Sequence, residues 1–175
     1  MLSHCTSTRF VANHSQLSRA RIDATSLAGA QMMLTYFEQA LIADSDFSRA
    51  ELDRANFTDA QVRGTKFVGA RLRDTRLDQA HVEDCDVQGA DFTYEERALK
   101  KLGRFVGTHF VNCDFRGASF TGRRLENTVF ERCKLGGIVG KPAIEGPYRV
   151  VRPDLSAAGD GSEVRDQAAV DALWK

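Results

Sequence analysis

The 175-residue chain lacks most of the features that would assign it to a familiar functional class. Its formal net charge is zero, which argues against a general nucleic-acid binder or a polybasic protein of the membrane surface. No apolar run approaches the length of a membrane span, and residues 1–10 lack the charged and apolar regions of a signal peptide. The sequence therefore predicts a cytoplasmic protein that contacts neither nucleic acid nor membrane directly.

Catalytic and metal-binding patterns are also missing. The sequence contains no glycine-rich phosphate loop and no nucleophile motif, so we expect neither an enzyme nor a cofactor. His81 and His109 form the best candidate pair of metal ligands, but no third ligand accompanies them. We therefore expect ordinary surface histidines and no metal site.

Proline is absent until residue 142, and the proline-free part of the chain has a period of five. From Ser15 to Ala90 every fifth residue is Ala, Ser, Thr or Cys, and two residues after each of them comes an apolar residue. This frame continues for sixteen repeats without exception, and seven further repeats follow residue 102, about 23 in all. The apolar site holds all but one of the eleven phenylalanines: Phe37, Phe47, Phe57, Phe67, Phe92, Phe105, Phe110, Phe115, Phe120 and Phe130.

A period of five fits neither an α-helix nor a flat strand. Successive apolar residues would spiral around a helix, and they would alternate between the two faces of a strand. All of them can point inward only if the chain turns a corner every five residues, which is the mark of a solenoid. Taking every twentieth residue groups Ile22, Ile42, Val62 and Val82 in one β-branched column, which favours four repeats per coil.

Units such as Ala50-Glu51-Leu52-Asp53-Arg54 and Ala55-Asn56-Phe57-Thr58-Asp59 resemble the A-(D/N)-(L/F)-x-x unit of pentapeptide-repeat proteins. The resemblance covers roughly residues 15–137, and it implies an all-β fold, the right-handed quadrilateral parallel β-helix of that family. One departure concerns the outward residue before the apolar site, which is Asp or Asn only at Asp46, Asn56, Asp86, Asp91 and Asp114. This departure affects the surface and leaves the expected fold unchanged.

The frame divides the chain into five segments. Residues 1–14 are expected to form an imperfect first coil that caps the open end, and residues 15–94 the regular coils. Residues 95–102 are the eight extra residues, predicted to project from one corner as a loop or short helical turn. Residues 103–137 continue the β-helix, and residues 138–175 form a C-terminal segment that contains the three prolines and a helix.

Three details of these segments are specific enough to test. Ser162 is expected to cap an amphipathic helix over residues 162–175, which would either cover the end of the coil or form a homodimer contact; its apolar residues would be Val164, Ala168, Leu173 and Trp174. Arg123 occupies a small site, where it cannot lie inside, so we expect a bulge or a guanidinium that reaches past the corner. Three cysteines at small sites, Cys85, Cys113 and Cys133, are expected to stay reduced.

Two groups of outward residues are candidates for binding a partner. The first joins an acidic cluster to the charged insert: Glu83, Asp84, Asp86, Asp91, Glu95, Glu96, Arg97, Lys100 and Lys101. The second is apolar and comprises Met33, Leu34, Tyr36 and Leu41, which form either a contact surface or packing beneath the N-terminal segment.

The resemblance implies a function as well as a fold. The best-understood members of the family protect bacterial DNA gyrase or topoisomerase IV from quinolones by imitating the width and negative charge of duplex DNA. It thus implies a non-catalytic binding protein in antibiotic resistance or self-immunity. Residues 15–94, however, carry nine basic and thirteen acidic residues, far fewer excess charges than a DNA duplex of that length. An interaction scaffold or effector with a partner unrelated to DNA is the alternative. An acidic stripe would favour the mimic, and an apolar patch the scaffold.

Overall fold

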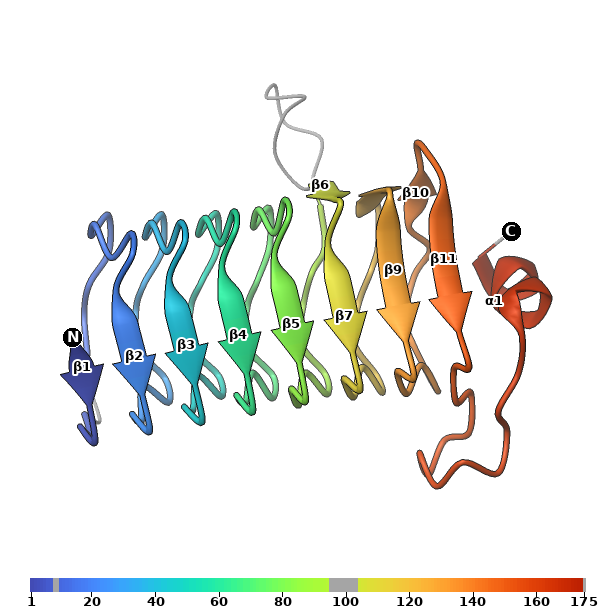
Figure 1. Ribbon diagram of the computed structural model, residues 1–175, viewed down its shortest axis with the longest axis horizontal. Helices are drawn as coiled ribbons and strands as arrows, with labels where there is room; N and C mark the ends of the chain where they lie inside the picture. The colour runs from blue at the N-terminus through green and yellow to red at the C-terminus, as the bar shows by residue number, and fades with distance from the viewer. Residues whose placement is uncertain (8–9, 95–103, 175) are drawn as a thin grey trace.

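The computed structural model describes residues 1–7, 10–94 and 104–174. It shows a parallel β-solenoid in which coils stack side by side along a rod, with one short helix at the C-terminal end (Figure 1). The larger sheet follows the order β1 (Leu2–Ser3), β2 (Arg21–Asp23), β3 (Leu41–Ala43), β4 (Gln61–Arg63), β5 (His81–Glu83), β7 (His109–Val111), β9 (Thr128–Glu131), β11 (Tyr148–Val151). The smaller sheet follows the order β10 (Ala143–Ile144), β8 (Arg124–Glu126), β6 (Arg104–Val106).

Each coil has four sides, which we number as faces 1 to 4 in chain order. The larger sheet forms face 1, and the smaller sheet covers the C-terminal part of face 4. Elsewhere single parallel bridges join one coil to the next, for example Gln31 to Glu51 on face 3. The register rises by twenty residues per coil, as in Ile22↔Ile42, and by twenty-eight at Val82↔Phe110, where eight extra residues lie between. The right-handed quadrilateral β-helix expected from the sequence is confirmed.

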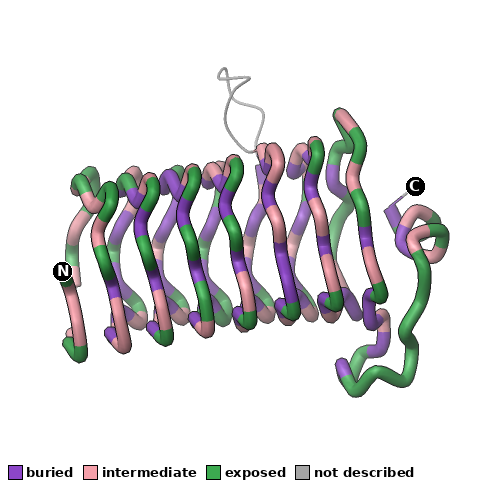
Figure 2. The backbone as a smooth tube through the Cα atoms, in the orientation of Figure 1, coloured by how far each residue is buried: buried purple, intermediate pink, exposed green. Residues whose placement is uncertain are grey.

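The inward side chains form one continuous core (Figure 2). All ten phenylalanines at the central sites of the repeats are buried. They stack on one another between coils: the rings of Phe37 and Phe57 lie 4.6 Å apart and nearly parallel. Because the small corner sites such as Ala30 and Ala55 are completely buried, the coils approach closely enough for the ladders to form.

One corner carries a hydroxyl or thiol donor in six successive coils. At the corner between faces 1 and 2, the inward side chain donates to the carbonyl two residues earlier, at 2.7–3.5 Å; the donors are Thr25, Ser45, Thr65, Cys85, Cys113 and Cys133. The cysteines therefore substitute for Ser and Thr here as well as for Ala. All four cysteines are free, and hydrogen bonding to Cys113 together with burial raises the pKa of the Cys85 thiol.

The coil extends beyond the residues that carry the clear repeat. At the N-terminal end β1 and bridges at Thr6, Val11 and Gln16 complete a first coil. At the other end the ladder continues through β11 to Asp154, although the five-residue pattern ends at Ile138. Main-chain pairing needs no particular side chain, so the ladder can continue where the repeat fades.

The C-terminal helix is shorter than the sequence predicts. It spans α1 (Gln167–Trp174), and Asp166, whose carboxylate accepts from the Ala169 amide, caps it in place of the predicted Ser162. Val170 and Trp174 face the last coil, whereas the predicted apolar residues Val164 and Leu173 are about half exposed. The helix covers the C-terminal end of the rod, where the Trp174 ring lies 5.4–6.4 Å from Tyr148, Phe120 and Phe130.

Candidate partner-binding edges

The outward charges become ordered when they are sorted by corner. We call the corner between faces 1 and 2 the acidic edge. It consists of the two outward residues that follow the apolar inward residue of each repeat on face 1. It also includes the outward residue that precedes the apolar inward residue of each repeat on face 2. Nine acidic residues (Asp23, Asp44, Asp46, Glu83, Asp84, Asp86, Asp114, Glu131 and Asp154) lie there with five basic ones (Arg63, Lys66, Arg132, Lys134 and Arg152), an excess of four negative charges.

The opposite corner has the opposite charge. We call the corner between faces 3 and 4 the basic edge. It carries six basic residues, Arg54, Arg73, Arg76, Arg104, Arg124 and Lys141, and two acidic ones, Asp53 and Asp74, among the residues that the structure describes. The excess charges of the two edges therefore cancel in the net charge of the chain.

The predicted acidic cluster divides between two surfaces. Glu83, Asp84 and Asp86 lie together on the acidic edge, where Asp84 accepts a hydrogen bond from Asn112 at 3.1 Å and faces Arg63 at 3.9 Å. Asp91 lies on face 3 and belongs to a different group of contacts. The other predicted residues of the first group, Glu95, Glu96, Arg97, Lys100 and Lys101, lie outside the described residues.

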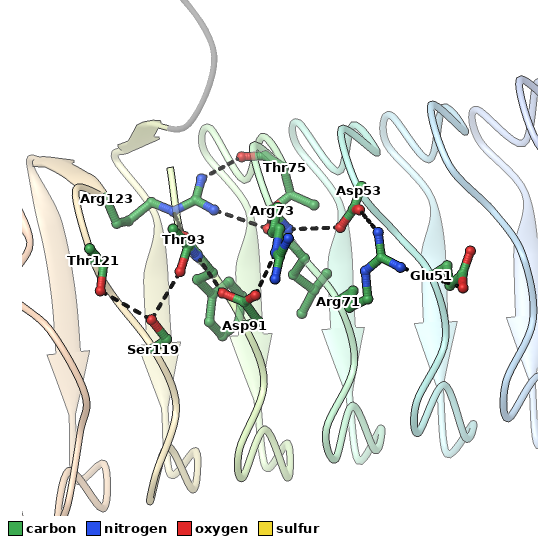
Figure 3. Close-up of polar contacts among 12 residues, drawn as sticks. Glu51, Asp53, Arg71, Arg73, Thr75, Asp91, Thr93, Ser119, Thr121 and Arg123 are labelled. Atoms are coloured by element: carbon green, nitrogen blue, oxygen red, sulfur yellow. Dashed lines mark hydrogen bonds and ion pairs between the residues drawn. The ribbon is translucent and has the colours of Figure 1, made fainter. Parts of the chain in front are cut away.

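Face 3 carries alternating charges that bind one another (Figure 3). Arg71 contacts both Glu51 and Asp53, and the Arg73 side chain donates to Asp91 at 2.6 Å. Burial opposes ionisation of Asp91, but hydrogen bonds from Thr93 and Arg73 outweigh it and lower the pKa of this carboxyl. Asp91 is thus held by its own chain, and it is less available to a partner than the acidic edge.

Arg123 lies inside the coil, which corrects the prediction that its side chain bulges or reaches outward. Its guanidinium is completely buried and donates to three main-chain carbonyls: Phe92 at 2.8 Å, Thr75 at 2.8 Å and Leu72 at 3.0 Å. It also lies over the Phe105 ring, 4.7 Å from its centre. Burial lowers the pKa of Arg123 to about 9, so the side chain remains charged at neutral pH.

The position of Arg123 explains its burial. Its side chain spans two coils and reaches the carbonyls beside the corner where residues 95–102 are inserted. Twenty residues earlier, at the same site of the repeat, the sequence has Gly103, which has no side chain. The sequence does contain a signal for this burial, because a long residue stands at the small site one coil after a glycine. The signal lies in the pair of sites and not in either site alone.

The predicted apolar group divides between a corner and a face. Met33, Leu34 and Tyr36 lie at the corner between faces 3 and 4, and Leu41 lies on face 1. Met33 and Leu34 are half-buried, whereas Tyr36 and Leu41 are 39% and 46% exposed, and a coil corner separates these two. The first coil stacks against the coil that carries these residues.

The two histidines are neighbours, as expected from their column. The ring centres of His81 and His109 are 5.2 Å apart, and His109 also lies 3.6 Å from Glu131. No group of three or more metal-ligating side chains occurs among the described residues. The two rings meet edge to face across adjacent coils.

Fold and surface together define a repeat β-solenoid with two oppositely charged edges. The model of the family described as Pentapeptide repeats matches in eight copies, over residues 15–59, 30–67, 55–93 and 104–137. The chain therefore belongs to the pentapeptide-repeat family, whose members are generally non-catalytic structural or binding proteins. No curated protein matches the sequence significantly.

Several solved structures are similar to this chain. A pentapeptide repeat protein of the Arabidopsis thaliana thylakoid lumen has 22% identity and a TM-score of 0.51, over 57% of this chain and 68% of that chain. Rfr23 from the cyanobacterium Cyanothece 51142 has 16% identity and a TM-score of 0.46, over 69% and 90%. QnrB1, a plasmid-mediated fluoroquinolone resistance protein, has 16% identity and a TM-score of 0.45, over 83% and 93%. No helix in the described ranges is long and apolar enough to cross a membrane.

Proposed function

We propose that this chain is a non-catalytic binding protein whose acidic edge docks on a basic surface of a partner protein, of the kind that binds DNA. The partners to test first are DNA gyrase and topoisomerase IV, which the family resemblance implies. The observation that carries the proposal is the excess of four negative charges on one edge of a rod whose total charge is zero.

The charge density sets the expected strength of binding. From β2 to β11 the acidic edge crosses six inter-strand steps of about 4.8 Å, or about 29 Å. Duplex DNA of that length carries about 17 negative charges, roughly four times the excess on this edge. Basic residues interrupt the edge in three coils, at Arg63 and Lys66, at Arg132 and Lys134, and at Arg152. We therefore expect weaker binding than a fully charged duplex would give, with strong sensitivity to salt.

The scaffold alternative has less exposed apolar surface to use. Of its candidates, Met33 and Leu34 are half-buried, and the exposed residues Tyr36 and Leu41 are separated by a coil corner. A scaffold that uses the insert remains open as the alternative if no topoisomerase responds.

Supercoiling assays test the proposal directly. Purified protein should restore the supercoiling activity of gyrase in the presence of a quinolone, or inhibit the enzyme at higher protein concentration. Asp84→Arg should weaken either effect about five-fold, because it reverses an exposed charge on the acidic edge. Asp59→Arg is a matched control: Asp59 is also exposed and also has a positive φ, but it lies on another edge. Equal activity of the two variants, or no effect on gyrase and topoisomerase IV at low salt, would refute the proposal.

A further inference from the structure

The C-terminal end of the rod contains a cavity between the last coil and α1. It has a volume of about 310 Å³ and is lined by apolar side chains, by the main chain of face 3 and by one carboxylate. The apolar lining includes Leu135, Leu155, Leu173 and Trp174, and the carboxylate belongs to Glu163. A concave, mostly apolar lining with one charged group is typical of a ligand site.

The cavity exists because the last coil lacks a side chain at one inward site. The face-3 column of large inward side chains ends at a glycine: Met32, Leu52, Leu72, Phe92, Phe120 and then Gly140. Gly140 has a φ of 74°, and a side chain there would collide with Thr121. The Trp174 ring, whose centre is 6.4 Å from that of Phe120, fills only part of the space that this leaves.

The main chain of the last coil keeps, on face 3, the groups that join each coil to the next. Between the last two coils of this face, Val139 donates to the Ala118 carbonyl and accepts from the Phe120 amide. The matching groups twenty residues later are the Ile138 carbonyl and the Gly140 amide, and neither bonds to another described residue. Both residues line the cavity. They therefore present the acceptor and the donor that pair with one residue of a parallel extended chain.

The chain itself closes the cavity on the side of face 2. The Leu155 amide donates to the Glu163 carbonyl at 3.1 Å, so residues around Glu163 cover the last step of that face. The Ser156 carbonyl lies over Gly136, so close that a side chain at Gly136 would collide with it. An extended chain that pairs with face 3 cannot continue in this direction, and one of its ends must lie at this corner.

The charge at the closed side determines which end fits. Glu163 lines the cavity there, and its carboxylate forms no ion pair among the described residues. It attracts an ammonium group and repels a second carboxylate. In the parallel orientation, in which the coils themselves stack, the amino end of an added chain lies on this side. We propose that the cavity binds the free amino terminus of an extended segment of a partner protein, with an apolar third residue above Gly140, a property separate from the proposed function.

The repeat itself supplies a probe. Residues 118–122 (Ala-Ser-Phe-Thr-Gly) occupy the equivalent positions in a lower coil, with Ala118 at the corner, Ser119 outward and Phe120 inward. The pentapeptide amide of that sequence contains no tryptophan, so the fluorescence of Trp174, the only tryptophan of the chain, reports its binding. The change should saturate, and isothermal titration calorimetry should give the same Kd. Acetylating the peptide should raise the Kd about five-fold, because the ammonium charge is lost.

Three variants separate the contacts. Glu163→Gln should raise the Kd of the free peptide about five-fold and leave that of the acetylated peptide unchanged. Leu173→Gln should weaken both peptides about five-fold, since Leu173 lines the cavity and is 57% exposed. Ile144→Gln is the matched control and should bind as the wild type does, because Ile144 is 45% exposed and lines a separate hollow beside Tyr148.

No binding of the free peptide by either method would overturn the proposal. Equal affinity for the free and acetylated peptides, or an equal effect of Glu163→Gln on both, would overturn it as well, because the amino terminus would then not be recognised. Weaker binding by Ile144→Gln and not by Leu173→Gln would place the segment on the edge of β10 and contradict the cavity as its site.

Discussion

Arg123 provides the sharpest test of how the coil passes the insertion. Replacing it by alanine removes the donor to the buried carbonyls of Phe92 and Thr75. The Leu72 carbonyl keeps a bond from the Thr75 hydroxyl at 2.8 Å, so two carbonyls, those of Phe92 and Thr75, lose the donor that they have among the described residues. Each costs about 1–3 kcal/mol. The cavity left by the missing side chain adds to this cost. Removing the buried guanidinium charge lowers it, because that charge no longer has to be taken out of water. We expect the free energy of unfolding to fall by roughly 3 kcal/mol.

Urea unfolding followed by circular dichroism measures this loss, and the fluorescence of Trp174, the only tryptophan, reports on the C-terminal end. Two probes are needed because a repeat array can unfold in parts. Arg54→Ala is the control, since Arg54 is half exposed and 3.7 Å from Asp74; it should cost less than about 1 kcal/mol. If Arg123→Ala loses no more stability than Arg54→Ala, the buried guanidinium does not hold this corner together.

Three further predictions follow from the frame. Phe57→Asp places an unpaired charge in the core and should prevent soluble folding, whereas Glu51→Lys, on an outward site, should leave the circular dichroism spectrum unchanged. Deleting residues 95–102 joins Tyr94, the last residue of one repeat, to Gly103, the small residue that opens the next, as Gln79 is joined to Ala80. The rod should therefore remain folded, and loss of soluble protein would show that the frame is misplaced. Burial and the bond to Asp171 raise the pKa of Tyr148, so its stabilisation of α1 is complete below about pH 10 and is lost at higher pH. Tyr148→Phe should expose Trp174 and remove that pH dependence of its fluorescence.

The sequence predicts the fold well because every repeat carries the same information. Twenty-three small and apolar sites agree on one period, so a local error cannot change the outcome. The ends are harder, since Ile138 to Asp154 stacks through main-chain bonds that leave no side-chain signature. The helix boundary was missed for a related reason: Ser162 and Asp166 are both possible caps, and packing against Tyr148 and Phe120 decides between them.

The candidate surface could not be predicted from the charged residues alone, because it depends on which of them the coil brings to one corner. Glu83, Asp84 and Asp86 are adjacent in the sequence and remain together, but Asp91 turns onto face 3, where Arg73 holds it. The two charged edges follow from the sequence when outward residues twenty apart are grouped together, with eight added across residues 95–102. Arg123 was misplaced because a charge at a small site was weighed without its neighbours in the adjacent coils.

The most direct test of the acidic edge is a binding titration of gyrase and of topoisomerase IV at several salt concentrations. Wild-type protein should bind with an affinity that falls steeply as salt rises, because exposed charges are screened. Asp84→Arg should bind more weakly at low salt and show a shallower salt dependence, while Asp59→Arg should behave as the wild type does. Binding that is independent of salt, or that both variants weaken equally, would contradict the acidic edge as the docking surface.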